Sequence, residues 1–104
     1  MQDVRFVNGE QLAELEREGG AVVVAFLATW NRRCQGFVDD YLGFAARHGG
    51  RVPVVAVDVD ECSSLTASHD VFSVPTILFL RGGVEVHRET GLDLERLDSL
   101  LRTP

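Results

Sequence analysis

Residues 21–34 read AVVVAFLATWNRRC, and this stretch decides the fold. Its first eight residues are apolar and rich in β-branched side chains, with no alternation between apolar and polar positions. Such a run is typical of a strand that is covered on both faces, as in a partly parallel sheet. From Asn31 to about His48, apolar side chains recur at intervals of three and four. The stretch therefore predicts a buried strand that leads directly into an amphipathic helix.

The segments on either side predict further helices and strands. Asn8 is a good helix cap, and Gln11 three residues later completes a capping box, so a helix is expected over residues 8–18. No strand is predicted before that helix. Gly82-Gly83 between two apolar runs indicates a tight hairpin. The remaining expected elements are strands at 52–59, 76–80 and 84–88, a short helix from Ser63 or Ser64 through His69, and a last helix at 94–101 with Asp93 in its first turn.

The order of these elements predicts an α/β architecture in layers. A parallel portion of sheet is followed by an antiparallel hairpin, and helices cover both faces. The chain has 104 residues and contains no repeat, linker or low-complexity stretch. One domain over residues 1–104 is therefore expected, because a chain of this length can bury a single core.

Composition excludes several classes of function. The formal net charge is −6 and all ten basic residues are arginines, so there is no lysine for a Schiff base or for a GxxxxGK[ST] phosphate loop. The acidic balance argues against nucleic-acid binding, which needs a basic face. The longest apolar run is too short to span a membrane, and the start of the chain lacks a signal-peptide pattern. We therefore expect a cytoplasmic protein with no membrane or nucleic-acid partner.

Three separated motifs resemble the thioredoxin family. The first is F-x-A-x-W at residues 26–30 with Cys34 four residues further on, and the second is Val74-Pro75-Thr76, which matches the family's cis-proline loop. The third, VDVDEC at residues 57–62, looks like a family strand and its exit, and Gly82-Gly83 and Gly91 fall at matching turns. The resemblance covers essentially the whole chain. It implies a thioredoxin fold, with a central mixed sheet of about four to five strands flanked by helices on both faces.

The resemblance also implies that the family's usual chemistry is impaired. Active members carry a W-C-x-x-C motif, in which the first cysteine is the nucleophile and the second resolves the mixed disulfide. In this chain the first position is Asn31 and the second is Cys34. An amide cannot form a thiolate, so the step that starts thiol–disulfide exchange is missing. The family's buried acid falls on Ala25 and its charged partner on Ala56, so ordinary dithiol reductase activity is expected to be absent.

Two hypotheses describe the activity that remains, and a structural subunit of a larger assembly is a third class without a specific signal. In the first, an extended peptide of a protein partner lies in an apolar groove, and arginines at the helix N-terminus form an anion-friendly rim. The residues of this groove and rim are Trp30, Val74 and Pro75, with Arg32 and Arg33. In the second, Cys34 acts as a monothiol whose thiolate is favoured by the helix dipole and these arginines, with glutathione or another small thiol as its partner.

Each of these residues also has a purely structural interpretation. Asn31 caps the helix, which is the interpretation that the sequence favours. Cys34 is a shielded core thiol, because the resolving position is the less exposed of the family's pair. Trp30 covers the end of the core, and the arginines are a solvated pair.

The second cysteine, Cys62, follows three acidic residues, and like-charge repulsion is expected to raise its pKa. It is a candidate regulatory thiol for an intermolecular disulfide, because His69 takes the place of the second cysteine that pairs with it in some eukaryotic thioredoxins. Spacing does not exclude a bridge from Cys34 to Cys62, but the fold is expected to hold them too far apart. Cys62 and His69 make a poor metal pair, and His48 and His87 lie elsewhere, so no metal site and no cofactor are expected.

Overall fold

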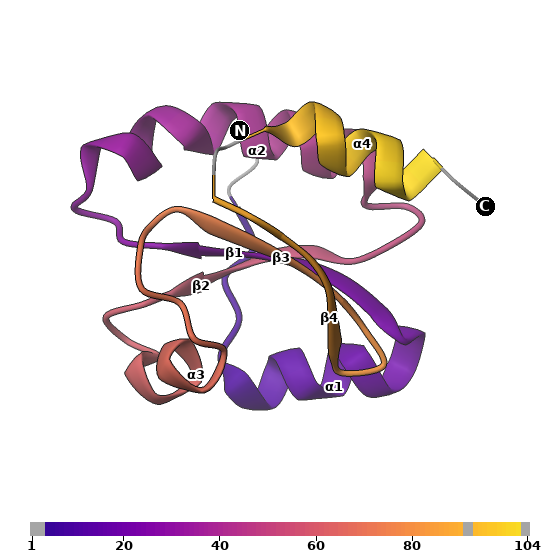
Figure 1. Cartoon of the computed structure of the whole chain (residues 1–104), viewed down its shortest axis with the longest axis horizontal. Coiled ribbons are helices and arrows are strands. Elements are labelled where there is room, and N and C mark those ends of the chain that lie inside the picture. Colours follow the sequence, from indigo (N-terminus) through magenta and orange to yellow (C-terminus); the bar gives the residue numbers. More distant parts are fainter. Residues whose placement is uncertain (1–3, 91–92, 103–104) are drawn as a thin grey trace.

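The computed structural model describes residues 4–90 and 93–102, and helices and strands follow one another along them in the predicted order (Figure 1). Several boundaries move, most clearly at the second strand, which is shorter at both ends than residues 52–59. Gly91, expected before the last helix, lies outside the described residues. The elements are α1 (Gly9–Gly19), β1 (Ala21–Leu27), α2 (Arg32–His48), β2 (Val54–Asp58), α3 (Ser63–Ser68), β3 (Thr76–Arg81), β4 (Val84–Glu89) and α4 (Leu94–Arg102).

The strands form one mixed sheet in the order β2-β1-β3-β4. β1 and β2 run parallel, whereas β1 with β3 and β3 with β4 run antiparallel. Helices α2 and α4 cover one face of the sheet, and α1 and α3 cover the other (Figure 1). The α/β layers and the four-stranded mixed sheet confirm the predicted fold class.

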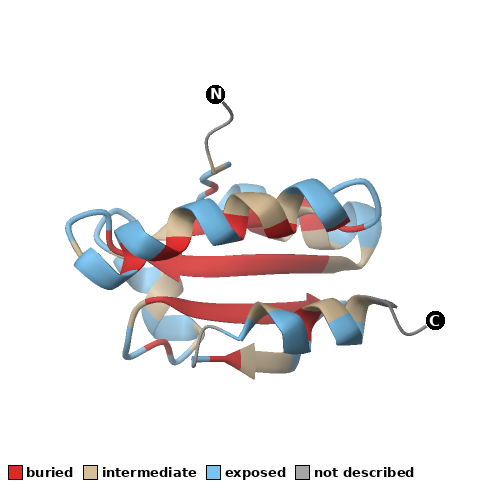
Figure 2. Cartoon of the chain, turned by 90° about the horizontal axis from the view of Figure 1, so that it is seen from above, coloured by how far each residue is buried: buried red, intermediate tan, exposed pale blue. Residues whose placement is uncertain are grey.

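The alternation of side chains along β1 explains its unbroken apolar sequence. Successive strand residues point to opposite faces, and here both faces are covered. Ala25 packs in a core with residues of α2 and α4, whereas the next residue, Phe26, packs in a second core with residues of α1 and α3. The central strands are therefore buried along nearly their whole length (Figure 2).

No strand precedes α1 in the described residues, as predicted, but the segment before this helix makes one backbone pairing with β2 that the sequence did not predict. Phe6 forms an isolated parallel bridge with Ala56 of β2. The amide of Val7 donates to the Ala56 carbonyl at 2.8 Å, and the Ala56 amide donates to the Arg5 carbonyl at 2.8 Å. This pairing involves backbone groups of only three residues, Arg5, Val7 and Ala56. A segment this short shows no repeating pattern of side chains from which a strand could be predicted.

Local sequence signals correctly predicted the start of α1 and the turn of the β3–β4 hairpin. Asn8 and Gln11 form the predicted capping box, with side-chain to backbone distances of 2.9 and 2.8 Å. Gly82 and Gly83 have φ values of 59° and 80°, a conformation that disfavours other residues and closes the β3–β4 turn. The predicted serine cap of α3 is wrong, because the helix begins after Cys62 without a side-chain cap.

Among the described residues, no helix combines the length and the apolar character that crossing a bilayer would require.

Candidate functional site

The predicted site residues meet at one end of the sheet, where β1 ends and α2 begins. Phe26 of β1 pairs with Thr76 of β3, so the Val74-Pro75 segment lies beside the end of β1. The peptide bond between Val74 and Pro75 is cis. The topology thus brings together two segments that are at least 40 positions apart in the sequence, residues 27–34 and 74–76.

Asn31 is the N-cap of α2, in agreement with its structural interpretation. Its Oδ1 accepts hydrogen bonds from the backbone amides of Arg33 at 2.9 Å and Cys34 at 3.2 Å. These amides belong to the first turn, where helical partners are lacking. The side-chain oxygen is therefore fully engaged in holding the helix end.

Cys34 is a buried thiol with a raised pKa, which contradicts the expectation of a favoured thiolate. The residue is 2% exposed, and its Sγ accepts a weak hydrogen bond from the Ala28 amide at 3.4 Å. Burial raises the pKa and outweighs the Ala28 amide and the Arg33 charge, which both lower it. The side chains of Arg32 and Arg33 are exposed, so water screens their charge while the thiol itself is desolvated.

Methyl groups occupy the two positions where the family resemblance implies a buried acid and its partner. Ala25 and Ala56 are paired in the β1–β2 register, are both 0% exposed and belong to the same core cluster as Cys34. The same row of the sheet continues through Ile77 to Glu89, a buried carboxylate that accepts a hydrogen bond from His87 at 3.1 Å. Glu89 is two strands from Ala25, about 10 Å at the usual strand spacing.

Trp30 is exposed and yet held in place. The side chain is 68% exposed, so it does not simply cover the core. Its Nε1 donates a hydrogen bond to Oδ2 of Asp60 at 2.7 Å. Asp60 is fixed in turn, because its amide donates to Oδ1 of Asp58 at 2.9 Å. Sequence reasoning missed this role of Asp60, since the bond joins residues 30 positions apart.

The other predicted groove residues differ in accessibility. Arg32 and Arg33 are exposed and Val74 is half-buried, but Pro75 is buried and adds little open surface. Phe72, three residues before Pro75, is 90% exposed and was not predicted. An aromatic residue inside the polar segment HDVFS was the available signal for it.

A cavity of about 400 Å³ reaches Cys34 from the side of the N-terminal segment. Its lining combines Phe6 with Leu27 and Ala28 at the end of β1 and Val38 of α2. The thiol therefore faces an apolar hollow, which sequence reasoning did not anticipate.

Cys62 lies away from this site. It packs against the core on the other face of the sheet from Cys34, and both cysteines are free, in agreement with the expected separation. The pKa of Cys62 is raised as predicted, although burial is the largest cause and the charges of Glu61 and Asp58 come second. In the described part of the chain, no group of three or more His, Cys, Asp or Glu side chains could hold a metal ion.

The chain has a mixed sheet between two pairs of helices, and a Trp-to-Cys turn at the start of α2 lies beside a cis Val-Pro segment. These features define a thioredoxin-like protein. The family model described as "Thioredoxin" matches residues 4–103. The chain belongs to the thioredoxin family.

Individual relatives agree with this assignment. Thioredoxin H9 of Arabidopsis thaliana is 32% identical over 88 residues, which make up 85% of this chain and 62% of that protein. The TPR repeat-containing thioredoxin TDX of the same plant is 35% identical and covers 94% of this chain but 27% of that protein. The chain thus spans less than two thirds of the length of these relatives. Among solved structures, Fasciola hepatica thioredoxin has a TM-score of 0.84 at 27% identity, with 95% of this chain and 97% of that chain covered.

Proposed function

We propose that this chain is a redox-impaired thioredoxin-like protein that binds an extended segment of a protein partner at the surface around Trp30. The observation that carries the proposal is an exposed indole held by the hydrogen bond to Asp60. A large aromatic side chain that is already immobilised loses little conformational entropy when a partner covers it. Such residues are frequent anchors of binding energy in interfaces.

The chemistry at the start of α2 supports the loss of ordinary turnover. Asn31 supplies no thiol, and its oxygen is engaged in the helix cap. Cys34 is buried with a raised pKa, so little of it is thiolate at neutral pH. Ala25 and Ala56 offer no group that could accept or donate a proton behind it. Nucleophile, activated thiol and proton acceptor are thus all missing from one site.

The rim of this surface favours a segment with acidic residues. Arg32 and Arg33 are exposed at the N-terminus of α2, and no ion pair joins either of them to a carboxylate among residues 4–90 and 93–102. Their guanidinium groups are free to bind carboxylates in pairs of parallel hydrogen bonds. In a chain of net charge −6, this rim is a local positive feature.

Selection from a random peptide library under reducing conditions tests the proposal. We expect extended peptides with at least one acidic residue to be enriched, and Trp30→Ala to weaken their binding about 10-fold or more, as loss of an interface anchor does. Val86→Ala removes an exposed apolar side chain from β4 and serves as the matched control, with unchanged affinity. Peptides that bind the Trp30→Ala protein as tightly as the native one, or no enrichment at all, would contradict the proposal.

The apolar cavity beside Cys34 favours a second candidate, monothiol exchange with glutathione or another small thiol. In this reaction the Cys34 thiolate attacks one sulfur of an oxidised small-molecule disulfide. A mixed disulfide forms at Cys34 and one small thiolate leaves, so Cys34 is oxidised and the departing sulfur is reduced.

The pH dependence of alkylation separates the two candidates. In a Cys62→Ser protein, only Cys34 reacts with iodoacetamide. Because burial raises its pKa above the ordinary value of a thiol, we expect the rate to be very low at pH 7 and still rising at pH 9, as the thiolate fraction increases. Mass spectrometry measures the rate, and Cys34→Ser in the same background sets the blank. A rate that reaches its plateau below pH 8 would refute the raised pKa and favour the monothiol function.

A further inference from the structure

A second hollow, which we call the basal pocket, lies at the end of the sheet opposite to Trp30. It has a volume of about 240 Å³ and opens between the end of α4, the end of α2 and the residues where β1 starts and β3 ends. Since β1 has seven residues, the basal pocket is about 23 Å from the Trp30 end at the usual rise per strand residue. A ligand in the basal pocket would therefore not touch the surface proposed for peptide binding.

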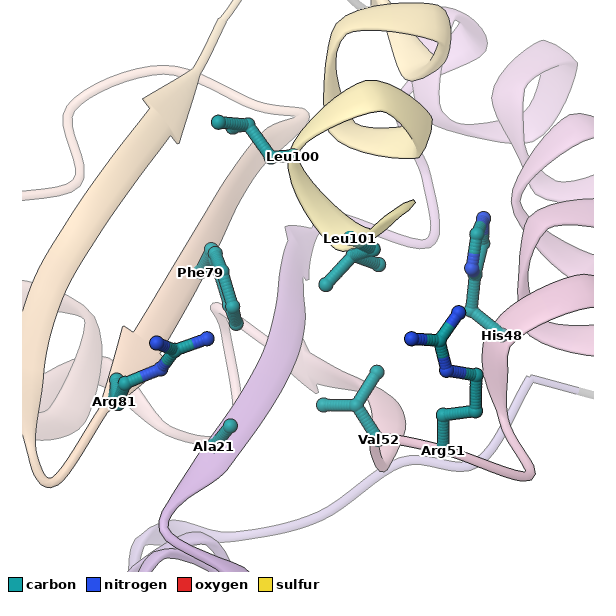
Figure 3. Close-up of a pocket in the computed structure, with 8 residues that line it drawn as sticks. All are labelled: Ala21, His48, Arg51, Val52, Phe79, Arg81, Leu100 and Leu101. Carbon is teal, nitrogen blue, oxygen red and sulfur yellow. The ribbon is translucent and has the colours of Figure 1, made fainter. Parts of the chain in front are cut away.

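The walls of the basal pocket are apolar. Phe79 and Ala21 come from neighbouring strands, Val52 from the segment before β2, and Leu100 and Leu101 from the last turns of α4 (Figure 3). Leu100 remains 37% exposed at the mouth of the basal pocket. An apolar ligand group placed here would bury part of this surface.

Three basic side chains complete the basal pocket, and none of its described lining residues is acidic. The guanidinium groups of Arg51 and Arg81 point toward each other from opposite sides (Figure 3). Neither forms an ion pair with a carboxylate in the described part of the chain. Arg81 is placed by its contact with the Phe79 ring, whose centroid is 5.4 Å from the guanidinium carbon.

The third basic residue, His48, is held at the edge of the basal pocket. It is buried, and its Nε2 is hydrogen bonded to Oδ1 of Asp98 on α4. Its ring also packs on Phe44, with centroids 4.7 Å apart. These contacts join α2 to α4 and give the basal pocket a fixed wall.

We propose that the basal pocket binds a small monocarboxylate with an apolar body. The carboxylate lies between Arg51 and Arg81, whose planar forks match its geometry, and the apolar body lies against Phe79 and the two leucines. The volume equals that of about eight waters at their liquid density, which accommodates a body of about six to eight carbon atoms. The net charge of −6 disfavours anion binding in general, so carboxylate binding in the basal pocket depends on its two arginines.

Titration with octanoate, followed by ¹⁵N-edited NMR of the full chain, tests the proposal. We expect saturable shifts of amides at residues 48–52, 79–82 and 100–101, with a dissociation constant of about 0.1–1 mM for a ligand of ten non-hydrogen atoms. 3-Phenylpropanoate forms a second arm, which distinguishes an aromatic from an aliphatic body. Octanamide, which has the same shape without the charge, and acetate, which lacks the body, are the controls and should bind at least about 10-fold more weakly.

Matched variants assign the interaction to the basal pocket. Arg51→Gln and Arg81→Gln are each expected to weaken octanoate binding about 10-fold. Arg96→Gln makes the same change of charge at an exposed residue of α4 outside the basal pocket and should leave binding unchanged. Equal affinity for octanamide, shifts centred on Trp30, unchanged binding in both arginine variants, or no saturation up to about 10 mM would each overturn the proposal.

Discussion

Replacing Asn31 with cysteine is expected to restore disulfide reduction, but at a rate about 100-fold below that of an active thioredoxin, because general acid–base help contributes at least that factor. The substitution supplies the missing nucleophile at the start of α2, where the helix N-terminus lowers a thiol's pKa. It does not supply the proton acceptor, because Ala25 and Ala56 remain beside Cys34 in the core. It also removes the Asn31 cap, which stabilises the fold by about 1 kcal/mol.

Reduction of insulin with dithiothreitol as the electron donor measures this rate. The native chain is expected to be at background, and so is Asn31→Ser, which keeps a capping side chain without a thiol. Full recovery in Asn31→Cys would show that the buried acid is dispensable in this chain. Turnover by the native chain would contradict the proposed redox impairment.

Adding Ala25→Asp to the Asn31→Cys protein is expected to raise the rate further while lowering stability at pH 7 by about 3 kcal/mol or more, the usual penalty for an uncompensated buried charge. Position 25 is 0% exposed and lies between Ala56 and Ile77 in the sheet, so the new carboxylate has no cationic neighbour in its row. The same group that penalises folding can accept the proton of the Cys34 thiol. Rate and stability should therefore move in opposite directions.

The loss of stability caused by Ala25→Asp is expected to increase as pH rises. Burial raises the pKa of a carboxyl in the folded state above its unfolded value of about 3.9. Between these two values the folded state binds more protons, so the loss of stability grows as pH rises, and it levels off above the folded pKa. Urea denaturation between pH 4 and pH 8 measures the effect. Ala25→Asn in the same Asn31→Cys background has a similar shape without the charge and serves as the control. Its loss of stability should not vary with pH, and its rate of insulin reduction should not rise. Identical behaviour of the Asp and Asn variants would contradict the role of charge.

The sequence was sufficient for most of the fold because its decisive signals are local. The apolar run of β1, the Asn8–Gln11 box and the Gly82-Gly83 turn each depend on neighbours along the chain, and the structure confirms all three. The parallel bridge at Phe6 was missed because it depends on backbone pairing with a segment about 50 residues away.

The site was less predictable because its energetics depend on three-dimensional surroundings. The sequence beside Cys34 shows two arginines and a helix start, which favour a thiolate, whereas desolvation by the folded core raises the pKa. The hydrogen bond from Trp30 to Asp60 joins residues 30 positions apart, and Arg51 and Arg81, equally far apart in the sequence, line one pocket. The spacing of residues along a single sequence does not reveal which distant residues lie close together in the fold.

The placement of the two thiols has a consequence for signalling. A thioredoxin with two motif cysteines has a reduced and an oxidised form, so a partner can distinguish them. Here the motif contains one thiol, Cys34, and Cys62 lies under the opposite face of the sheet. The motif cannot close a disulfide on itself, so no intramolecular disulfide at the start of α2 can switch the Trp30 surface between two forms. In the binding function proposed above, partner recognition is expected to vary with the abundance of this chain and not with the oxidation of a motif disulfide.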